Sequence, residues 1–256
     1  DKLNITEYTQ ICMLAVEAAI YQAIIDKGIT PDVTAGLSLG EYGALIASGA
    51  MTMADAFAVV RKRGIYMQEA VPTGGAMTAV LGLDPQVIED ICKKTVDETN
   101  SVVSVANYNC PGQIVITGEK AAVDAAAAAC SEAGAKRCVP LKVSGPFHSA
   151  MLKGAGEKLA DALESVEIHD IKVPYITNVT ADYVKSPADV KDYLVRQVSS
   201  SVRWQQTIER LIADGADEFV EIGPGRSLSG FMRKINRDIK VVNIDKLEDF
   251  EKYVNR

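Results

Sequence analysis

A serine between two glycines is the first feature of this sequence that suggests chemistry. Gly36-x-Ser38-x-Gly40 matches the nucleophile-elbow pattern, in which small residues allow a sharp strand-to-helix turn that exposes the serine hydroxyl. The residues before it are strand-like, and the apolar segment EYGALIASG after it predicts a buried helix. We therefore predict that Ser38 is a nucleophile. The alternative is a glycine-containing turn whose serine caps the helix.

A serine nucleophile needs a base, and the sequence offers two histidines, His148 and His169. His148 follows Gly-Pro-Phe at a break between a predicted strand and a predicted helix, where functional residues tend to be placed. His169 lies between acidic residues in the segment EIHD, which is typical of a solvated position. We therefore predict that His148 is the general base. The alternative is a histidine that caps or packs against a helix.

The rest of a serine-based site is less evident from the residues. A helix that begins just after Ser38 would point its first amides at the serine, so the Leu39 N–H is predicted to donate to an oxyanion. An α/β hydrolase would also place an acid between the serine and the histidine in the chain. The acids considered there lie at no obvious strand end of the main sheet: Asp84, Glu89, Asp90, Asp97, Glu98, Glu119, Asp124 and Glu132. Either the third member is missing, or a group such as a backbone carbonyl orients the imidazole.

These residues must be positioned by a main body of alternating helices and strands. Helical periodicity covers residues 9–26 and 52–67, and short strand-like segments occur at residues 33–35, 173–178, 218–222 and 241–244 with helical segments between the later ones. Strands that alternate with helices indicate an α/β fold with a parallel sheet. With the elbow, this predicts an α/β-hydrolase-like core formed by residues 1–75 and 144–256.

The segment 76–143 has a different pattern. Its strand-like and helical stretches alternate in the order βαββαβ, which is typical of a ferredoxin-like unit with a small core of its own. We therefore predict that residues 76–143 form a ferredoxin-like subdomain inserted into the α/β core.

Composition excludes several other classes of protein. The chain has 256 residues, of which 48% are hydrophobic and 24% charged, so neither disorder nor a fibre is indicated. The formal charge of −7 disfavours nucleic-acid binding. Five cysteines without a C-x-x-C pair argue against disulfides and against a metal site. No long apolar stretch or secretory signal stands out, so we expect a cytoplasmic protein that does not cross a membrane.

Six segments of the sequence together resemble one enzyme family. GLSLGEYGAL, RKRGIYMQEAVP, NYNCPGQIVITGE, SGPFHSAML, VRWQQTIERL and EIGPGRSLSGFM occur in the order and approximate spacing seen in malonyl-CoA:acyl carrier protein transacylases, the acyltransferases of type II fatty acid synthesis. The resemblance extends over essentially the whole chain. Six collinear segments are far more specific than any one of them.

The resemblance implies roles for individual residues. Ser38 is expected to carry the malonyl group as an ester, with His148 as its base, and Arg63 is expected to hold the free malonyl carboxylate. A planar guanidinium suits a carboxylate, although without the resemblance Arg63 would look like a solvated basic helix end. The family orients its histidine with a main-chain carbonyl just before the tryptophan of V-x-W. Here that carbonyl would belong to Arg203.

Further positions match the pocket of the family. Asn107 and Asn109 match asparagines near the mouth of the site, although they could equally be a turn pair ahead of a Pro-Gly. Phe147 matches a position where phenylalanine goes with malonyl and a smaller residue admits an α-methyl group. Leu37 departs from the histidine or glutamine often found before the nucleophile, which leaves the exact pocket wall open.

The resemblance implies ping-pong transfer of malonyl from malonyl-CoA to the phosphopantetheine thiol of acyl carrier protein, by a cytoplasmic monomer with no metal or permanent cofactor. One departure is a glycine-glutamine-glycine segment that family members carry before this chain's first helix and that supplies a second oxyanion donor. Losing one such donor lowers turnover on the order of 100 to 1,000-fold. Two alternatives stay open: a serine thioesterase or hydrolase that uses the same elbow, and an inactive carrier-protein-binding module if the N-terminal segment is truly absent.

Overall fold

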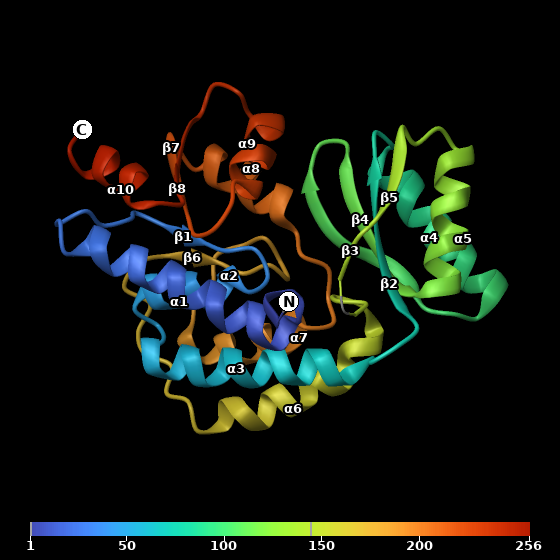
Figure 1. Ribbon diagram of the computed structural model, residues 1–256, viewed down its shortest axis with the longest axis horizontal. Coiled ribbons are helices and arrows are strands. Elements are labelled where there is room, and N and C mark those ends of the chain that lie inside the picture. The colour runs from blue at the N-terminus through green and yellow to red at the C-terminus, as the bar shows by residue number, and fades with distance from the viewer. Residues whose placement is uncertain (1, 144) are drawn as a thin grey trace.

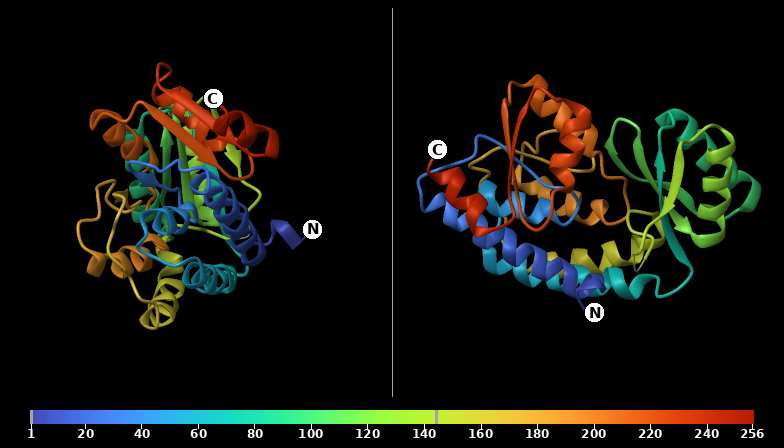
Figure 2. Two further views of the ribbon diagram at one scale, coloured as in Figure 1. Left: turned by 90° about the vertical axis from the view of Figure 1, so that its left-hand side faces the viewer. Right: turned by 45° about the horizontal axis from the view of Figure 1, so that its top comes forward.

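Two bodies of secondary structure lie side by side in the computed structural model, which describes residues 2–143 and 145–256 (Figure 1). One body holds both ends of the chain and most of the helices. The chain leaves it after helix α3 to form a four-stranded sheet with two helices, and then returns (Figure 2). The predicted boundary at residue 144 and the first residue of SGPFHSAML fall on a residue outside this description.

The larger body consists mainly of helices, and five of them pack around one large apolar cluster. Leu14 of the first long helix packs there with Tyr42, Leu45, Val60 and Leu159. The helices of this body are α1 (Thr6–Ile25), α2 (Gly40–Ser48), α3 (Met53–Ala70), α6 (Lys153–Glu164), α7 (Val190–Gln197), α8 (Trp204–Ala213), α9 (Ser227–Ile235) and α10 (Leu247–Val254). The five around the cluster are α1, α2, α3, α6 and α7. Short 3-10 turns occur at Lys2–Asn4, Ala150–Leu152 and Pro187–Asp189. Helix α10 was not predicted from the sequence.

The strands of this body form two parallel pairs. β1 (Thr34–Ala35) pairs with β6 (Tyr175–Ile176), and β7 (Glu218–Ile222) pairs with β8 (Lys240–Ile244). The predicted α/β class with parallel strands is therefore confirmed, as two separate pairs in the described part of the chain. Because β1 and β6 are parallel neighbours, the residues that follow them emerge at the same edge. This edge carries the serine turn.

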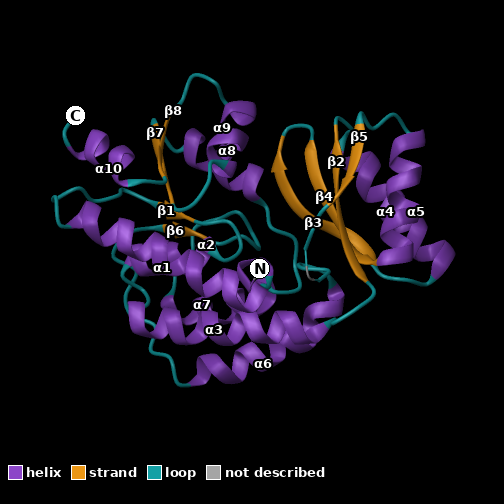
Figure 3. Cartoon of the chain, in the orientation of Figure 1, coloured by secondary structure: helices purple, strands orange, loops and turns teal. Residues whose placement is uncertain are grey.

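The smaller body has the predicted ferredoxin-like topology. Its elements are β2 (Gly75–Leu81), α4 (Pro85–Thr99), β3 (Val103–Cys110), β4 (Gln113–Glu119), α5 (Lys120–Glu132) and β5 (Arg137–Pro140). The sheet order is β3-β4-β2-β5 and every neighbouring pair is antiparallel. Helices α4 and α5 cover one face of the sheet (Figure 3), where Val80, Ile88, Ile116 and Val123 form a separate core.

The edge strand β3 joins the two bodies. The Val202 N–H donates to the Ala106 carbonyl at 2.8 Å, and the Tyr108 N–H donates to the Val202 carbonyl at 2.9 Å. The Ser201 hydroxyl adds a bond to the Val105 carbonyl at 2.6 Å. The segment between α7 and α8 therefore pairs with the subdomain like a short extra strand.

Helix α1 is long and strongly apolar. Among the described residues it is the one helix that could cross a membrane by length and composition, with a mean hydropathy of 1.3 over its most apolar window. However, Leu14 and Ala18 lie in the apolar cluster described above, and α1 packs along α3. A core helix passes the same test of length and hydropathy, so this criterion is weak support for a membrane span.

Candidate active site

The turn between β1 and α2 has the geometry of a nucleophile elbow. A Cβ atom on Gly36 would lie 1.9 Å from the Gly40 carbonyl oxygen, so only glycine fits this close backbone approach. Ser38 has a φ of 53°, in the left-handed region. The Asn178 side chain, just beyond β6, accepts from the Ser38 N–H at 2.6 Å and donates to the Gly36 carbonyl at 2.6 Å. Asn178 thereby holds both ends of the strained turn.

Ser38 and His148 form the hydrogen-bonded pair that a serine nucleophile requires. Ser38 Oγ lies 2.8 Å from His148 Nε2, and His148 Nδ1 lies 2.9 Å from the Gln197 carbonyl oxygen. Burial and then the charge of Arg63 lower the His148 pKa to about 4, against hydrogen bonds to backbone at Gln197 and Ser200 that raise it. The imidazole is therefore neutral near pH 7, and its Nε2 can accept the serine proton while Nδ1–H donates to the carbonyl.

The backbone carbonyl that orients His148 belongs to Gln197, and the prediction of Arg203 was wrong. Gln197 is the last residue of α7, where carbonyls have no partner within the helix. The Arg203 carbonyl instead accepts from the N–H and the hydroxyl of Thr207, at 3.0 and 2.9 Å, in the first turn of α8. A carbonyl engaged in starting a helix is not available to the imidazole.

Arg63 lies beside Ser38 and is not a solvated helix end. Its side chain is 2% exposed, and Nη2 donates to Ser38 Oγ at 3.0 Å and to Gln197 Oε1 at 3.0 Å. Nη1 donates to Gln10 Oε1, and the Tyr42 ring centre lies 5.7 Å from the guanidinium carbon. A buried cation therefore lies directly beside the serine hydroxyl.

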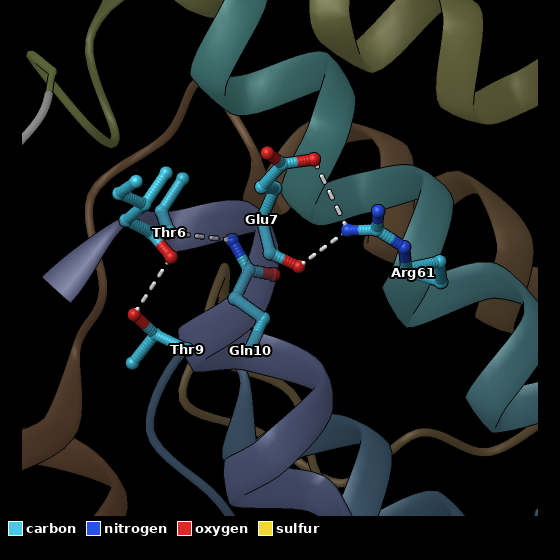
Figure 4. A network of polar contacts seen from close by, with 6 residues as sticks. Thr6, Glu7, Thr9, Gln10 and Arg61 are labelled. Atoms are coloured by element: carbon cyan, nitrogen blue, oxygen red, sulfur yellow. Dashed lines mark hydrogen bonds and ion pairs between the residues drawn. The ribbon is translucent and has the colours of Figure 1, made fainter. Parts of the chain in front are cut away.

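The start of α1 is fixed to α3 in a way that orients Gln10 (Figure 4). The Arg61 guanidinium donates to the Glu7 carbonyl at 2.8 Å and to its carboxylate at 3.2 Å. One helical turn along, Gln10 Nε2 donates to the Thr6 hydroxyl at 3.1 Å. Because the nitrogen of the Gln10 amide is engaged with α1, its oxygen is free to face Arg63.

Three polar residues under the elbow were missed by the sequence reasoning. Gln197 Nε2 donates to the Ser38 carbonyl at 2.9 Å and to Glu41 Oε2 at 2.7 Å, and the Asn178 N–H donates to the same carboxylate oxygen at 3.0 Å. One signal in the sequence could have found Glu41, which is a lone acid in an apolar helix three residues after the serine. Asn178 and Gln197 gave no such signal, since the role of Asn178 depends on the pairing of β1 with β6 and that of Gln197 on the packing of α7.

A cavity of about 420 Å³ opens beside His148. It lies where β3 of the subdomain faces the segment between α7 and α8, so both bodies of the molecule contribute to its wall. The residues that line it are Ser104, His148, Ala150, Val179, Ser199, Ser200, Ser201 and Arg203. Arg203 thus lines this cavity, although its carbonyl does not bind His148.

The remaining predicted residues form no hydrogen bond with the serine hydroxyl in the described part of the chain. Phe147 packs against the large apolar cluster and against the sheet of the subdomain. Leu37 packs near Ile176 and Trp204. Asn107 and Asn109 are buried on β3. Their roles in the pocket, and that of Leu39 as an oxyanion donor just before α2, stay predictions.

A metal ion requires a group of ligating side chains. Residues 2–143 and 145–256 contain no group of three or more His, Cys, Asp or Glu side chains that could hold a metal ion. The five cysteines are free thiols, as expected from their spacing. The expectation of a site without a metal stays a prediction.

Comparison with known proteins gives this site a family. The family model for the acyl transferase domain matches residues 1–244. The malonyl CoA-acyl carrier protein transacylase of Bacillus subtilis is 46% identical over 252 residues, which cover 98% of this chain and 79% of that protein. The chain belongs to the malonyl CoA-acyl carrier protein transacylase family.

Solved structures agree with this assignment to the transacylases. The crystal structure of MCAT from Streptococcus pneumoniae matches with a TM-score of 0.95 and 46% identity, covering 100% of this chain and 83% of that one. A malonyl-transacylase in complex with a type II PKS acyl-carrier protein matches with a TM-score of 0.95 and 40% identity, covering 99% and 82%. The predicted family and fold class are confirmed.

Proposed function

We propose that this chain transfers the malonyl group of malonyl-CoA to the phosphopantetheine thiol of an acyl carrier protein through a malonyl ester of Ser38, in type II fatty acid biosynthesis. One observation carries the proposal: the buried Arg63 guanidinium lies 3.0 Å from Ser38 Oγ, which itself lies 2.8 Å from His148 Nε2. The names of the relatives in the same family support the same reaction.

The distance between Arg63 and Ser38 suits a short acyl group with a terminal carboxylate. In a malonyl thioester a single methylene separates the carboxylate from the reacting carbonyl carbon. A guanidinium in contact with the nucleophile can therefore bind the carboxylate while the serine attacks the carbonyl. An uncharged acyl group of the same length would leave this buried cation without a negatively charged partner, which is costly.

The first half-reaction uses the pair of Ser38 and His148. His148 Nε2 takes the hydroxyl proton as Ser38 Oγ attacks the thioester carbonyl, and the oxyanion is held by the Leu39 N–H. The C–S bond then breaks, and the CoA sulfur leaves with the proton from His148. The transient imidazolium is stabilised by the Gln197 carbonyl at the C-terminal end of α7, where the helix dipole favours a cation.

The second half-reaction reverses these roles. The phosphopantetheine thiol reaches the ester through the cavity beside His148, gives its proton to Nε2 and attacks the carbonyl carbon. The Ser38–acyl bond breaks, and Ser38 recovers its proton from His148. These steps need only this chain's own groups, so we propose no resident cofactor. A monomeric state and a cytoplasmic location also remain proposals.

Intact-mass analysis tests the proposed function. Exposure to malonyl-CoA should add one malonyl group to the wild-type chain and none to Ser38→Ala, and added carrier protein should remove the group as malonyl-carrier product. Arg63→Ala should lower the rate of malonyl uptake about 100-fold and lower acetyl uptake far less, because a buried charge pair is lost only for malonyl. Release of free malonate without carrier product would instead indicate a hydrolase. Equal losses for both acyl groups would contradict the role of Arg63.

A further inference from the structure

A buried carboxylate lies directly beneath the reactive residues without contacting the reacting atoms. Glu41 in the first turn of α2 is 0% exposed. Its Oε2 accepts from the Asn178 N–H at 3.0 Å and from Gln197 Nε2 at 2.7 Å. It forms no ion pair within 4.0 Å among the residues that the structure describes. Burying a carboxylate costs free energy, so a buried Glu41 without such an ion pair indicates a specific role.

The contacts of Glu41 determine which way the Gln197 amide points. The amide nitrogen donates to Glu41 Oε2 and to the Ser38 carbonyl, so the amide oxygen faces the other way. There Oε1 accepts from Arg63 Nη2 at 3.0 Å. If the amide turned over, its NH2 group would face the guanidinium, and two donors would oppose each other. The acceptors around this nitrogen, which also include Asn178 Oδ1 at 3.5 Å, thus fix one orientation of Gln197, and Glu41 Oε2 is the nearest of them.

This arrangement keeps Arg63 available to a substrate. The groups that accept from Arg63 are the amide oxygens of Gln10 and Gln197 and the hydroxyl of Ser38, all of them neutral. A carboxylate in direct contact with Arg63 would occupy the fork that binds carboxylates in pairs of parallel hydrogen bonds. The Gln197 amide lies between the guanidinium and Glu41 and prevents that direct pair.

The surroundings of Glu41 favour the acceptor role. Burial raises the pKa of Glu41, while hydrogen bonds from the Asn178 N–H and from Gln197 Nε2 and the charge of Arg63 oppose that rise. Each of these neighbours offers a proton or a positive charge to the carboxylate. The position is therefore built to accept hydrogen bonds, which an amide oxygen of the same reach could also do.

We propose that Glu41 is a positioning residue that orients the Gln197 amide, and through it Arg63, and so sets the preference for an acyl group that carries a carboxylate. This inference rests on the proposed malonyl transfer. It predicts that the acyl preference depends on how far the acceptor oxygen of residue 41 lies from the backbone more than on its charge, because the effect passes through the hydrogen-bonded amide of Gln197.

Two conservative variants separate reach from charge. Glu41→Gln keeps an acceptor oxygen at the same distance from the backbone and loses the charge, so the ratio of malonyl to acetyl kcat/KM should stay within about threefold of wild type. Glu41→Asp keeps the charge but withdraws the carboxylate by one methylene. It can no longer meet both the Asn178 N–H and Gln197 Nε2, so the ratio should fall about tenfold or more.

A third variant removes the Gln197 amide itself. Gln197→Leu keeps the backbone carbonyl that bonds His148 and removes the side-chain amide. It should lower the malonyl to acetyl ratio as Glu41→Asp does, and it decides the matter if Glu41→Asp does not fold. The matched control is Glu221→Asp, since Glu221 on β7 also accepts from backbone N–H groups, those of Leu228 and Ser229, and contacts none of these residues. It should lower the melting temperature and leave the ratio unchanged.

The outcomes are distinct. The proposal would be overturned if the malonyl to acetyl ratio fell in Glu41→Gln and stayed at the wild-type value in Glu41→Asp, because the charge of Glu41 and not its positioning of Gln197 would then set the preference. A folded Gln197→Leu with the wild-type ratio would also overturn it. A wild-type chain that takes up acetyl as readily as malonyl, or neither, contradicts the proposed function itself and the role of Glu41 with it.

Discussion

At the scale of single residues, Ser38 Oγ lies between two groups that act on it in complementary ways. His148 Nε2 accepts its proton, and Arg63 Nη2 donates to the same oxygen at 3.0 Å. A nearby cation favours the negative charge that develops on the serine oxygen during attack. The same cation opposes a proton on His148 and thus helps to keep the base neutral. In the proposed mechanism, Arg63 would therefore serve both Ser38 as nucleophile and His148 as base before any substrate carboxylate arrives.

The lowered pKa of His148 predicts an unusual acid limb of the pH profile. The base must be neutral, and burial and Arg63 lower its pKa to about 4 in the folded protein. The rate of Ser38 acylation should therefore be nearly constant from about pH 5 to pH 8 and fall to half near pH 4. Stopped-flow acylation by malonyl-CoA measures this limb. A midpoint near the ordinary histidine value of about 6.5 would contradict the neutral, desolvated base.

The same shift has a consequence for stability with a defined sign. Because the folded state holds His148 neutral, the unfolded chain binds more protons between the unfolded pKa of about 6.5 and the folded value of about 4. The contribution of His148 to the free energy of unfolding is thus fully present above about pH 6.5 and declines as the pH falls through this window. The acid limb of activity should be fitted on samples whose fold is verified by circular dichroism at each pH.

At the scale of elements, the sequence predicted what local patterns encode and missed what depends on chain path. The elbow at Ser38 and the breaks around His148 were visible because glycine spacing and strand-to-helix transitions are local. The carbonyl partner of His148 was assigned to Arg203 and belongs to Gln197, because which helix end meets the imidazole depends on how α7 packs. Asn178 escaped notice since its role arises from the parallel pairing of β1 with β6.

The close backbone approach between Gly36 and Gly40 can be tested by substitution. Gly36→Ala would place a Cβ 1.9 Å from the Gly40 carbonyl oxygen, so the elbow must distort. We expect the free energy of unfolding to fall by about 3 kcal/mol or more, as for the severe class of backbone clashes, with loss of Ser38 acylation. Gly40→Ala is the matched control in the same turn, because a Cβ there meets no atom within 4 Å. Urea unfolding compares the two, and equal stabilities would refute the close-approach argument.

At the scale of the whole molecule, the inserted subdomain forms one wall of the site. The α/β core supplies Ser38, Arg63 and His148, while β3 of the subdomain contributes Ser104 to the cavity beside the histidine. The βαββαβ order of the stretches in residues 76–143 predicted the subdomain, but nothing local indicated that its edge strand would pair with residue 202. That pairing sets how far apart the two walls of the cavity stand.

Val202→Pro tests this coupling. Proline lacks the N–H that donates to the Ala106 carbonyl at 2.8 Å, so the junction between β3 and the segment after α7 should loosen. A wider mouth admits water to the malonyl ester of Ser38, and we expect its hydrolysis to speed up about threefold or more relative to Val202→Ala, which keeps the N–H. Free malonate released from preloaded enzyme measures this rate. Hydrogen exchange at Tyr108, whose N–H donates to the Val202 carbonyl, should rise in parallel, and unchanged exchange in the proline variant would show that this pairing does not hold the walls together.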